Sequence, residues 1–447
     1  MENIINVKGT HDVIGSEAAN YNRIEETMKS IARFFAFKEY RPPVIESSSL
    51  FQRSVGESSD VVRKEMYNFL DKSQRSITLR PEFTAGIVRS FVNNKLYATE
   101  TLPVKAYYLG PVFRYERPGL GRYRQFNQFG IEVLGSNSYL DDVDAIALGY
   151  TILENLGFEK VEVLINTLGD EESRNRYKEA LKEYFASHID NMCEDCKERF
   201  KLNPLRILDC KVKEDQLIVA DAPRMKDYLS DEARARFEKV CSALDALDIE
   251  CVYDDTLVRG LDYYSETVFE FHYISSKGND YGAIGAGGHY SNLVKELGGP
   301  QLDGVGFSFG IERVYSVMKD DGLLSDEEDN IELYVMPLGK ESIETAYSLA
   351  LSLRLSGYVT EVDLSGAKMA SMFKKAEKAK ADYGIILGEN EIANKTVIVK
   401  DLCSKNQEEI KIDDLVQYLD DKYLASEEPC DGEDEDCNKK HPEGEDE

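Results

Sequence analysis

The sequence predicts an α+β protein: a sheet-based first part that is interrupted by a helical insertion and followed by a smaller α/β domain. Three observations predict this fold class. Residues 105–135 contain aromatic and β-branched runs on both sides of a glycine-rich loop, which is typical of a hairpin. Residues from about 170 to 250 are charged and have helical spacing instead. After residue 330, short apolar runs alternate with helical segments, as parallel strands joined by helices do.

The first third of the chain alternates between helical and extended segments. Apolar residues recur at helical spacing over 18–37, which predicts an amphipathic helix. Two prolines follow, and residues 41–51 are therefore expected to be extended. Residues 76–92 have the pattern of a strand, a turn and a helix, and after the hairpin a helix over 140–158 is expected to end near its last glycine.

Strands are expected to resume at Cys251, after the insertion, and to continue through the glycine-rich residues 281–293. Residues 304–318 predict a strand followed by a helix, and the polar residues 319–330 predict a linker. The smaller domain is then predicted from four apolar runs, with helices between the first three. The runs are 331–339, 358–364, 383–389 and 395–402, and the helices are 342–357 and 367–380.

These segments divide the chain into a core over 1–325, which contains the insertion of about 170–250, and an α/β domain over 331–422. Residues 425–447 have almost no apolar side chains and are expected to form a disordered acidic tail. The net charge is −29, and because residues 427–447 account for −9 of it, the rest still carries −20. Any RNA contact must therefore rest on a local basic patch, such as the lysines of 368–380, although a solvated helix face is the simpler interpretation of those lysines.

The lack of visible targeting signals and the spacing of the cysteines predict a cytoplasmic protein without a membrane partner. No stretch approaches the roughly 18 apolar residues of a membrane span, and the first residues show no signal peptide. The eight cysteines lack the spacing of a disulfide framework. Cys193 and Cys196 form a CxxC with Cys210 and His188 nearby, but structural zinc sites usually have a second paired half-site. Free thiols are therefore favoured, no metal ligand is assigned, and a bound metal is the open alternative.

Arginines and carboxylates concentrate on the segments that are expected to form the sheet. Alternate side chains of a strand share a face, so Arg114 and Glu116 are expected to point the same way, as are Gln128 and Glu132 on the return strand. The same spacing recurs upstream at Arg80, Glu82 and Thr84. A solvated, salt-bridged face is the simpler interpretation. The density of aromatic residues indicates a buried sheet, however, and buried charges need partners such as a bound polyanion.

Two further segments carry polar residues that suit an anionic ligand. Arg313 stands where a strand of small residues meets a helix and could hold a phosphate, and Arg259 stands just before Tyr263 and Tyr264. The chain has no Ser–His or Cys–His nucleophile motif, no P-loop and no Rossmann fingerprint, and its five histidines are scattered. This set of residues favours phosphoryl-type chemistry that is driven by positioning and charge stabilisation.

Five segments resemble the class II aminoacyl-tRNA synthetases, and closely the bacterial histidyl-tRNA synthetase family. FRYERPGLGRYRQFNQFGIE around Arg114 resembles motif 2, GVGFSFGIERV around Arg313 resembles motif 3, and RPPVIES around Pro43 resembles motif 1. LVRGLDYYSETVFEF and GAIGAGGHYSNLV resemble the two signature peptides of the histidine enzymes. The resemblance extends over roughly residues 5–422, and the two signature peptides are highly specific.

The resemblance implies a fold and a reaction. The fold would be an antiparallel sheet core with flanking helices, a helical insertion and a C-terminal α/β anticodon-binding domain. The reaction would be the activation of histidine with ATP and Mg²⁺ to histidyl-adenylate and pyrophosphate, followed by transfer of histidine to the 3′ end of tRNA(His). The family also implies a homodimer, with Pro43 at the interface.

The resemblance also implies roles for individual residues. The ATP-binding residues would be Arg114 (α-phosphate), Arg313 (γ-phosphate), Arg122 (β,γ-phosphates), Glu116 (adenine) and Phe126 (stacking on adenine). The histidine-binding residues would be Glu82, Thr84 and Gln128 (α-amino group), Glu132 and Tyr264 (imidazole), and Tyr263 and Tyr290 (pocket). Arg259 would bridge the histidine carboxylate and the α-phosphate, and it would be catalytic together with Arg114 and Arg313.

The chain departs from the family pattern at three positions, none of which has an assigned role. His289 and Ser291 stand where the family usually has arginine and aspartate, and Asn127 stands where histidine or an aromatic residue is common. One alternative is a non-catalytic regulatory subunit of ATP phosphoribosyltransferase, but such proteins lack the RGLDYY peptide and the C-terminal domain that this sequence has. A second alternative, a sensor of uncharged tRNA, is disfavoured because the sequence has no kinase motifs and keeps its ATP-site arginines.

Overall fold

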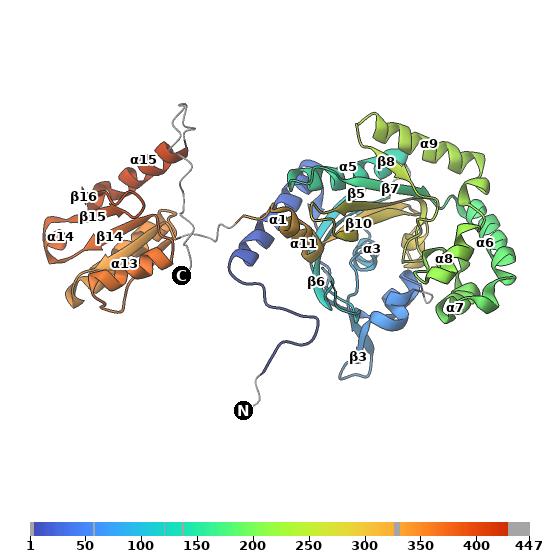
Figure 1. The fold of residues 1–447 in the computed structure, drawn as a ribbon, viewed down its shortest axis with the longest axis horizontal. Coiled ribbons are helices and arrows are strands. Elements are labelled where there is room, and N and C mark those ends of the chain that lie inside the picture. The colour runs from blue at the N-terminus through green and yellow to red at the C-terminus, as the bar shows by residue number, and fades with distance from the viewer. Residues whose placement is uncertain (1–3, 57–58, 120, 136–137, 326–330, 428–447) are drawn as a thin grey trace. The chain divides into compact units, whose positions relative to one another are not determined.

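The computed structural model describes residues 4–427 apart from 57–58, 120, 136–137 and 326–330. The chain forms two compact units, Met1–Asp326 and Glu327–Glu447, which are described separately below. Figure 1 shows a large sheet with helices in the first unit and a smaller sheet with helices in the second. The expected α+β class is confirmed. Among the described residues, no helix is both long enough and apolar enough to cross a membrane.

An eight-stranded sheet forms the centre of the first unit, in the order β1-β5-β6-β11-β10-β9-β7-β8. Its strands are β1 (Lys38–Glu39), β5 (Val104–Phe113), β6 (Gln125–Leu134), β7 (Glu162–Thr167), β8 (Cys251–Tyr253), β9 (Ser265–Ile274), β10 (Asp280–Tyr290) and β11 (Gly304–Gly310). The six strands from β5 to β7 are antiparallel, and only the edge pairs β1–β5 and β7–β8 are parallel. The predicted hairpin is confirmed, since Val104 pairs with Leu134 and Phe113 with Gln125.

Three long helices cover one face of this sheet: α1 (Ser16–Phe34), α5 (Tyr139–Asn155) and α11 (Ile311–Asp321). All three were expected from helical spacing. Their apolar stripes bury an aromatic cluster on the central strands, which includes Phe269, Phe271, Phe307 and Phe309. Burying such side chains contributes about 1.5–3 kcal/mol each, so this face is the main source of the unit's stability. The opposite face is left free for polar residues.

A small sheet, β2 (Ile45–Ser47), β4 (Ser76–Leu79) and β3 (Tyr67–Leu70), lies beside four short helices on the opposite face. These helices are α2 (Ser48–Ser54), α3 (Thr84–Asn93), α4 (Leu96–Thr99) and α10 (Leu293–Glu296). The expectation of an extended segment through residue 51 was wrong after Ser47, because Leu50, Phe51 and Ser54 are buried at helical spacing in α2.

The segment between β7 and β8 is fully described, and its regular elements are helical. They are α6 (Glu171–Ala186), α7 (Glu194–Leu202), α8 (Lys213–Ala220) and α9 (Asp231–Asp245), with three short 3₁₀ turns at Ile189–Asn191, Pro204–Asp209 and Met225–Asp227. α6, α7 and α8 lie together at one end of the first unit (Figure 1) and enclose a core of their own.

The second unit contains a five-stranded sheet in the order β13-β12-β14-β15-β16. Its elements are β12 (Leu333–Pro337), α12 (Ile343–Leu355), β13 (Thr360–Val362), α13 (Met369–Lys378), β14 (Tyr383–Leu387), α14 (Glu389–Asn394), β15 (Thr396–Asp401), β16 (Gln407–Lys411) and α15 (Leu415–Glu427). The first three strands are parallel, as expected. The fourth was predicted in the same α/β pattern but is antiparallel, and the charged edge strand β16 was not predicted.

Two predicted segments fall partly outside the described residues. The predicted linker begins inside α11, which ends at Asp321, and its last five residues, 326–330, are not described. Residues 425–427 of the predicted tail continue α15, and the rest of that tail, 428–447, lies outside the described residues.

Candidate active site

A cavity of about 360 Å³ lies on the face of the large sheet that α1, α5 and α11 leave free. Its wall comes from the hairpin β5–β6, from β10 and β11, from the start of α3 and from the loop before β9. The structure brings thirteen sequence-predicted site residues together around it: Glu82, Thr84, Arg114, Glu116, Arg122, Phe126, Gln128, Glu132, Arg259, Tyr263, Tyr264, Tyr290 and Arg313. The fourteenth, Pro43, is exposed and does not line the cavity.

Glu132 lies at the closed end of the cavity, where its side chain is 1% exposed. One carboxylate oxygen accepts hydrogen bonds from Thr84 Oγ1 at 2.6 Å and Tyr108 Oη at 3.3 Å, and the other accepts one from Tyr290 Oη at 2.7 Å. Burial raises the pKa of Glu132 to about 8, although hydrogen bonds from Thr84 and Tyr290 act in the opposite direction. This end of the cavity therefore offers a fixed, desolvated acceptor for an N–H donor.

Two glycines make room for this carboxylate on the floor of the sheet. A Cβ atom on Gly306 would lie 2.1 Å from Glu132 Oε2, and one on Gly130 would lie 2.4 Å from Tyr108 Oη. Both distances are far below contact distance. The small residues of β11 and β6 are therefore required by the position of the polar side chains between them.

Further polar groups surround Glu132. Glu82 is buried, which raises the pKa of its carboxyl group, and its Oε1 accepts the backbone N–H of Ala85 at 3.0 Å. Burial also raises the pKa of the Tyr263 and Tyr264 hydroxyls, so both are neutral hydrogen-bond donors at physiological pH. Gln128 on β6 is buried as well. A small zwitterion with an N–H-bearing ring would find partners for each of its polar groups here.

The open end of the cavity is cationic. Arg114 Nε donates to the carbonyl oxygen of Pro81 at 2.8 Å, and Arg313 Nη1 donates to that of Ala283 at 2.6 Å. Among the described residues neither guanidinium has a carboxylate within ion-pair distance, so their charges are available to an anion. The Arg114 guanidinium lies 5.4 Å from the centre of the Phe126 ring, which can stack with a planar base.

Arg259 lies between these two ends. Its Nη1 donates to Glu270, whose other oxygen is hydrogen-bonded to His272 Nε2 at 2.8 Å, and its guanidinium lies 5.7 Å from the centre of the Tyr264 ring. Burial lowers the pKa of Arg259, but Glu270 together with Tyr264 and Tyr263 raises it, and the net shift is upward. The guanidinium is therefore a permanent charge held at one place.

Two predictions placed site residues on strands that end before them. Arg114 and Glu116 were expected to point the same way along a strand, but β5 ends at Phe113, so both lie in the following loop, from which both line the cavity. Arg80 was expected to share a face with Glu82 and Thr84, but β4 ends at Leu79. Arg80 turns away from the cavity and donates to the carbonyl oxygens of Pro42 at 2.7 Å and Pro111 at 2.9 Å.

Sequence reasoning assigned no role to several polar residues that line the cavity, among them Asp60, Glu65, Tyr108 and Arg206. Arg206 is the most informative, because it belongs to the insertion and is buried, and its Nε and Nη1 atoms have no hydrogen-bond partner among the described residues. Nothing in the local pattern of NPLRILDC, the run around it, indicates that its side chain lines the cavity. Only the packing of the insertion brings it there.

His289, one of the three departures from the family pattern, lies outside the cavity. Its Nδ1 is 2.9 Å from Asp142 on α5 and its Nε2 is 3.3 Å from Asp303, while Arg236 on α9 also reaches Asp142. Burial lowers the pKa of His289, but Asp142 and Asp303 outweigh it and raise it to about 9. His289 is therefore a buried cation that helps to hold α5 and α9 to the sheet.

This position predicts a pH-dependent stability. Because the folded pKa is about 9 and the unfolded pKa is about 6.5, the charged His289 stabilises the fold fully below pH 6.5, and this contribution is lost as pH rises through 9. It amounts to on the order of 3 kcal/mol. His289→Gln is expected to lower the Tm at pH 6.5 and to have little effect at pH 9.5, where Asp142, Asp303, Arg236 and Glu266 face a neutral ring in the parent protein. Thermal unfolding of both proteins across this pH range measures the difference in Tm. A difference that is constant with pH would contradict a charged His289 in the folded protein.

Comparison with known proteins gives consistent matches along the chain. The family model described as "Histidyl-tRNA synthetase" matches residues 9–314, and the one described as "Anticodon binding domain" matches residues 332–422. The histidine–tRNA ligase of Lactiplantibacillus plantarum is 44% identical over 412 residues, which is 92% of this chain and 97% of that protein. The histidine–tRNA ligase of Bacillus subtilis is 43% identical over 415 residues, again 92% of this chain and 97% of the relative.

Solved structures agree with these matches. The apo histidyl-tRNA synthetase of S. aureus has a TM-score of 0.80 at 34% identity, over 93% of this chain and 99% of that one. A protein from Bacillus halodurans C, described as an ATP phosphoribosyltransferase regulatory subunit/histidyl-tRNA synthetase, has a TM-score of 0.61 at 20% identity, over 86% of this chain and 98% of that one. At that identity the second likeness bears on the fold alone.

Proposed function

Because the chain belongs to the histidyl-tRNA synthetase family, we propose that the cavity on its large sheet is the place where histidine and ATP react. The activity is that of a histidine–tRNA ligase. The anticodon-binding domain over residues 332–422 favours this enzyme over the regulatory subunit of ATP phosphoribosyltransferase. The observation that carries the proposal is the convergence of all thirteen predicted substrate residues on one cavity with a carboxylate end and an arginine end.

Histidine is proposed to bind at the carboxylate end. Its imidazole N–H donates to Glu132, and the Tyr264 hydroxyl meets the other ring nitrogen. Glu82 and Gln128 accept hydrogen bonds from the α-ammonium group. The Thr84 hydroxyl donates its proton to Glu132, and its oxygen can accept a further hydrogen bond from the α-ammonium group. A competing amino acid without an imidazole leaves these buried groups unpaired, and such sites reject competitors by about 10⁴–10⁵-fold.

ATP is proposed to bind at the cationic end, with adenine stacked on Phe126 and contacted by Glu116. Arg114 holds the α-phosphate, Arg122 lies near the β- and γ-phosphates, and Arg313 holds the γ-phosphate. Arg114 and Arg313 are fixed by backbone carbonyls rather than by carboxylates, which supports this assignment, because a bound polyphosphate would supply their missing counter-charge.

Mg²⁺ is proposed to accompany ATP and to neutralise the charge of its phosphates. Mg²⁺ usually binds through one or two carboxylates together with phosphates and water. Glu65 lines the cavity near Arg114, so the residues present fit such a partly bound ion. Loss of activity in the presence of a chelator, restored by added Mg²⁺, tests this requirement.

The second substrate, tRNA(His), is proposed to contact the second unit through its anticodon. Exposed lysines on and beside α13 (Lys368, Lys374 and Lys378) are candidates for phosphate contacts. Lys375 is a weaker candidate, because it is held by Asp363 at 2.7 Å and Ser365 at 2.9 Å. A cytoplasmic location, where charged tRNA is used for translation, follows from this activity.

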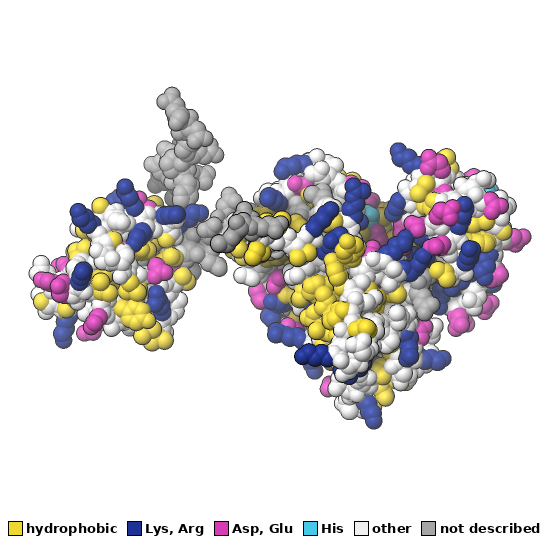
Figure 2. Space-filling model, turned by 90° about the horizontal axis from the view of Figure 1, so that it is seen from below, with side chains coloured by type: hydrophobic (Ala, Val, Ile, Leu, Met, Phe, Trp, Pro, Cys, Tyr) yellow, Lys and Arg dark blue, Asp and Glu magenta, His cyan; other side chains and the backbone are white. Residues whose placement is uncertain are grey.

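The active form is proposed to be a homodimer with Pro43 at its interface. Pro43 precedes the edge strand β2, and apolar side chains of this small sheet are exposed, among them Ile45, Phe69 and Leu70. Figure 2 shows hydrophobic side chains gathered over one area of the first unit. Exposed apolar surface of this kind is typical of an interface. A solution molar mass of one chain, measured by light scattering, would exclude the dimer.

The function is tested by amino-acid-dependent ATP–pyrophosphate exchange across the standard amino acids. Histidine alone is expected to support exchange, because only its side chain can pair with both Glu132 and Tyr264. Transfer to tRNA(His) is then measured with radiolabelled histidine. If folded protein with Mg²⁺ present showed no exchange with any amino acid, the result would favour the alternative of a regulatory subunit of ATP phosphoribosyltransferase.

A further inference from the structure

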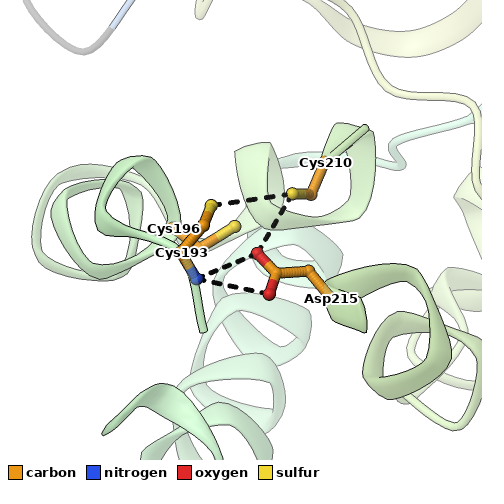
Figure 3. A group of neighbouring side chains, drawn as sticks. All are labelled: Cys193, Cys196, Cys210 and Asp215. Carbon is orange, nitrogen blue, oxygen red and sulfur yellow. Dashed lines mark hydrogen bonds between the residues drawn. The ribbon is translucent and has the colours of Figure 1, made fainter. Parts of the chain in front are cut away.

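Three cysteines and an aspartate converge inside the insertion: Cys193, Cys196, Cys210 and Asp215 (Figure 3). One ligand atom from each, the three Sγ atoms and a carboxylate oxygen, can be chosen so that all four lie within 4.8 Å of one another. In the part of the chain that the structure describes, this is the only group of three or more His, Cys, Asp or Glu residues that is arranged to hold a metal ion. It lies apart from the residues that line the cavity.

Three separate elements bring these side chains together. Cys193 is the N-cap of α7 and Cys196 lies in its first turn, so the CxxC places both thiols at one helix end. Cys210 follows the 3₁₀ turn Pro204–Asp209, and Asp215 lies in the first turn of α8. The sequence contains a CxxC with a single Cys downstream, and the fourth ligand is supplied by a carboxylate that only the packing of α8 against α7 reveals.

The distances match a tetrahedral ion. A zinc ion with Zn–S bonds of about 2.3 Å and tetrahedral angles places its sulfur ligands about 3.8 Å apart. The Sγ atoms of Cys193 and Cys210 are 3.9 Å apart, and Cys210 Sγ is 3.2 Å from Asp215 Oδ2. The ligand atoms all lie within 4.8 Å of one another, so an ion requires the widest pairs to close by at most about 1 Å.

The burial of the group is hard to explain without a ligand. Cys196 and Cys210 are buried, and Asp215 is 1% exposed. The two Asp215 oxygens accept the backbone N–H of Cys193 at 3.2 Å each and a weak hydrogen bond from the Cys210 thiol. A buried carboxylate needs a strong partner, and a thiol is a weak donor. A divalent cation at the centre of the group supplies that partner.

Main-chain donors also surround the group, although in the metal-free protein burial raises the pKa of the Cys196 and Cys210 thiols. The group lies at the N-terminal ends of α7 and α8, where backbone N–H groups and the helix dipoles stabilise negative charge. The backbone N–H of Val212 is hydrogen-bonded to Cys210, and that of Cys193 to Asp215, so the ligands are oriented by main-chain donors around them.

We propose that Cys193, Cys196, Cys210 and Asp215 bind a structural Zn²⁺ ion in a closed, four-coordinate site. Three thiol protons leave as the three Zn–S bonds form, and Asp215 contributes an oxygen that is already ionised. The complex carries a net charge of −2, no electron is transferred, and all four positions are filled by protein, so the ion takes no part in the reaction itself.

The position of the site gives the ion a structural consequence. It ties the start of α7 to the segment before α8 and to the first turn of α8, and between these points the chain contacts the catalytic core at several places. Among these contacts, Asn203 Nδ2 donates to Asp262 at 2.9 Å, Arg199 Nη2 donates to Asp60 at 3.0 Å, and Arg206 lines the cavity. Zinc therefore fixes the loop that carries Arg206 toward the cavity.

The test uses the full chain, purified reduced from zinc-supplemented medium. Elemental analysis is expected to find about one zinc per chain. After removal by a chelator, titration with Co²⁺ is expected to give the intense visible and near-ultraviolet bands of a tetrahedral thiolate complex, saturating at one equivalent. A purified chain without zinc, together with a metal-free chain that gives only the weak spectrum of octahedral Co²⁺, would overturn the proposal. This measurement needs no variant, so it decides the matter even if the variants do not fold.

Variants then assign the ligands. Cys196→Ser and Cys210→Ser are expected to lose the zinc and the cobalt bands, whereas Cys241→Ser in the neighbouring helix α9 keeps both and serves as the matched control. Asp215→Asn is expected to weaken Co²⁺ binding about tenfold or more. Unchanged Co²⁺ affinity and an unchanged spectrum in Asp215→Asn would overturn the four-ligand set. Because these readouts are metal content and spectra, they are independent of whether the cavity residues have the roles proposed above.

Discussion

Replacing Arg259 by alanine is expected to lower the rate of histidine-dependent ATP–pyrophosphate exchange by about 10³-fold. The formation of histidyl-adenylate brings two anions, the histidine carboxylate and the α-phosphate, to bonding distance. At about 4 Å and an effective dielectric constant of 20, their repulsion is on the order of 4 kcal/mol. Arg259 lines the same cavity as Glu132 and Arg114, and in the role proposed here its guanidinium contacts both anions.

The environment of Arg259 shows why no neighbouring side chain is expected to replace its guanidinium in the alanine variant. Glu270 holds the guanidinium in place and is itself held by His272, so the cation is fixed before the substrates bind. Arg259→Lys keeps the charge but loses the planar fork that can bridge two groups, so it is expected to recover only part of the rate. Glu270→Gln is expected to have a smaller effect, because the charge remains and only its orientation is weakened.

The controls separate chemistry from folding. Arg234→Ala, on the exposed side of α9, is the matched control and is expected to keep the parent rate. Folding is checked by thermal unfolding of each variant. A folded Arg259→Ala protein that retains exchange within about fivefold of the parent would remove the bridging role, even though the activity as a histidine–tRNA ligase would stand.

The sequence predicted the composition of the site better than its geometry. The thirteen predicted site residues were assigned because they lie in short segments that resemble local family motifs, among them the hairpin around Arg114, the strand before Arg313 and the peptide around Arg259. The direction of Arg80 was wrong because Pro81 and the start of α3 end the strand, and alternation holds only while a strand continues. Local periodicity cannot show where an element ends to within a residue or two.

What could not be predicted depends on contacts between distant segments. Arg206 reaches the cavity only because the insertion packs against the core, and Asp215 joins three cysteines only because α8 packs beside α7. The edge strand β16 was missed because its sequence, QEEIK, is charged, and pairing with β15 alone makes it a strand. In each case the deciding interaction joins residues whose own neighbourhood gives no signal.

Replacing Glu132 by glutamine is expected to raise the KM for histidine by about 10²-fold and to leave the KM for ATP within about twofold of the parent. Glutamine has nearly the same shape but no charge, so the charge-assisted hydrogen bond from the imidazole N–H is lost. Thr84, Tyr108 and Tyr290 all donate toward this position, and an amide has one oxygen where the carboxylate has two. Steady-state exchange kinetics with each substrate varied in turn separate the two KM values.

The pH dependence of histidine binding gives a second, independent expectation. The pKa of Glu132 in the empty cavity is raised by burial to about 8, so at pH 7 the carboxyl group is mostly protonated and lacks the negative charge that strengthens the hydrogen bond from the imidazole N–H. The Kd for histidine is therefore expected to fall about eightfold between pH 7 and pH 8.5, as the carboxylate forms. This dependence is expected to be absent in Glu132→Gln. Calorimetric titration at several pH values measures it, and an equal pH dependence in both proteins would assign the titration to another group.

The raised pKa of Glu132 also affects the stability of the fold. As pH rises, ionisation of Glu132 favours histidine binding but lowers the free energy of unfolding. A carboxyl group whose folded pKa of about 8 exceeds its unfolded value of about 4.5 destabilises the fold progressively as pH rises from 4.5 to 8, because the ionised form is worse solvated inside than outside. Without histidine, Glu132→Gln is therefore expected to unfold at a temperature no lower than the parent at pH 8.5, while binding histidine far more weakly. Glu266→Gln, at a half-buried carboxyl group outside the cavity whose pKa is also raised by burial, is the matched control and should leave histidine binding unchanged. A Glu132→Gln protein that lost both stability and binding would show that Glu132 serves the fold rather than the recognition of the imidazole.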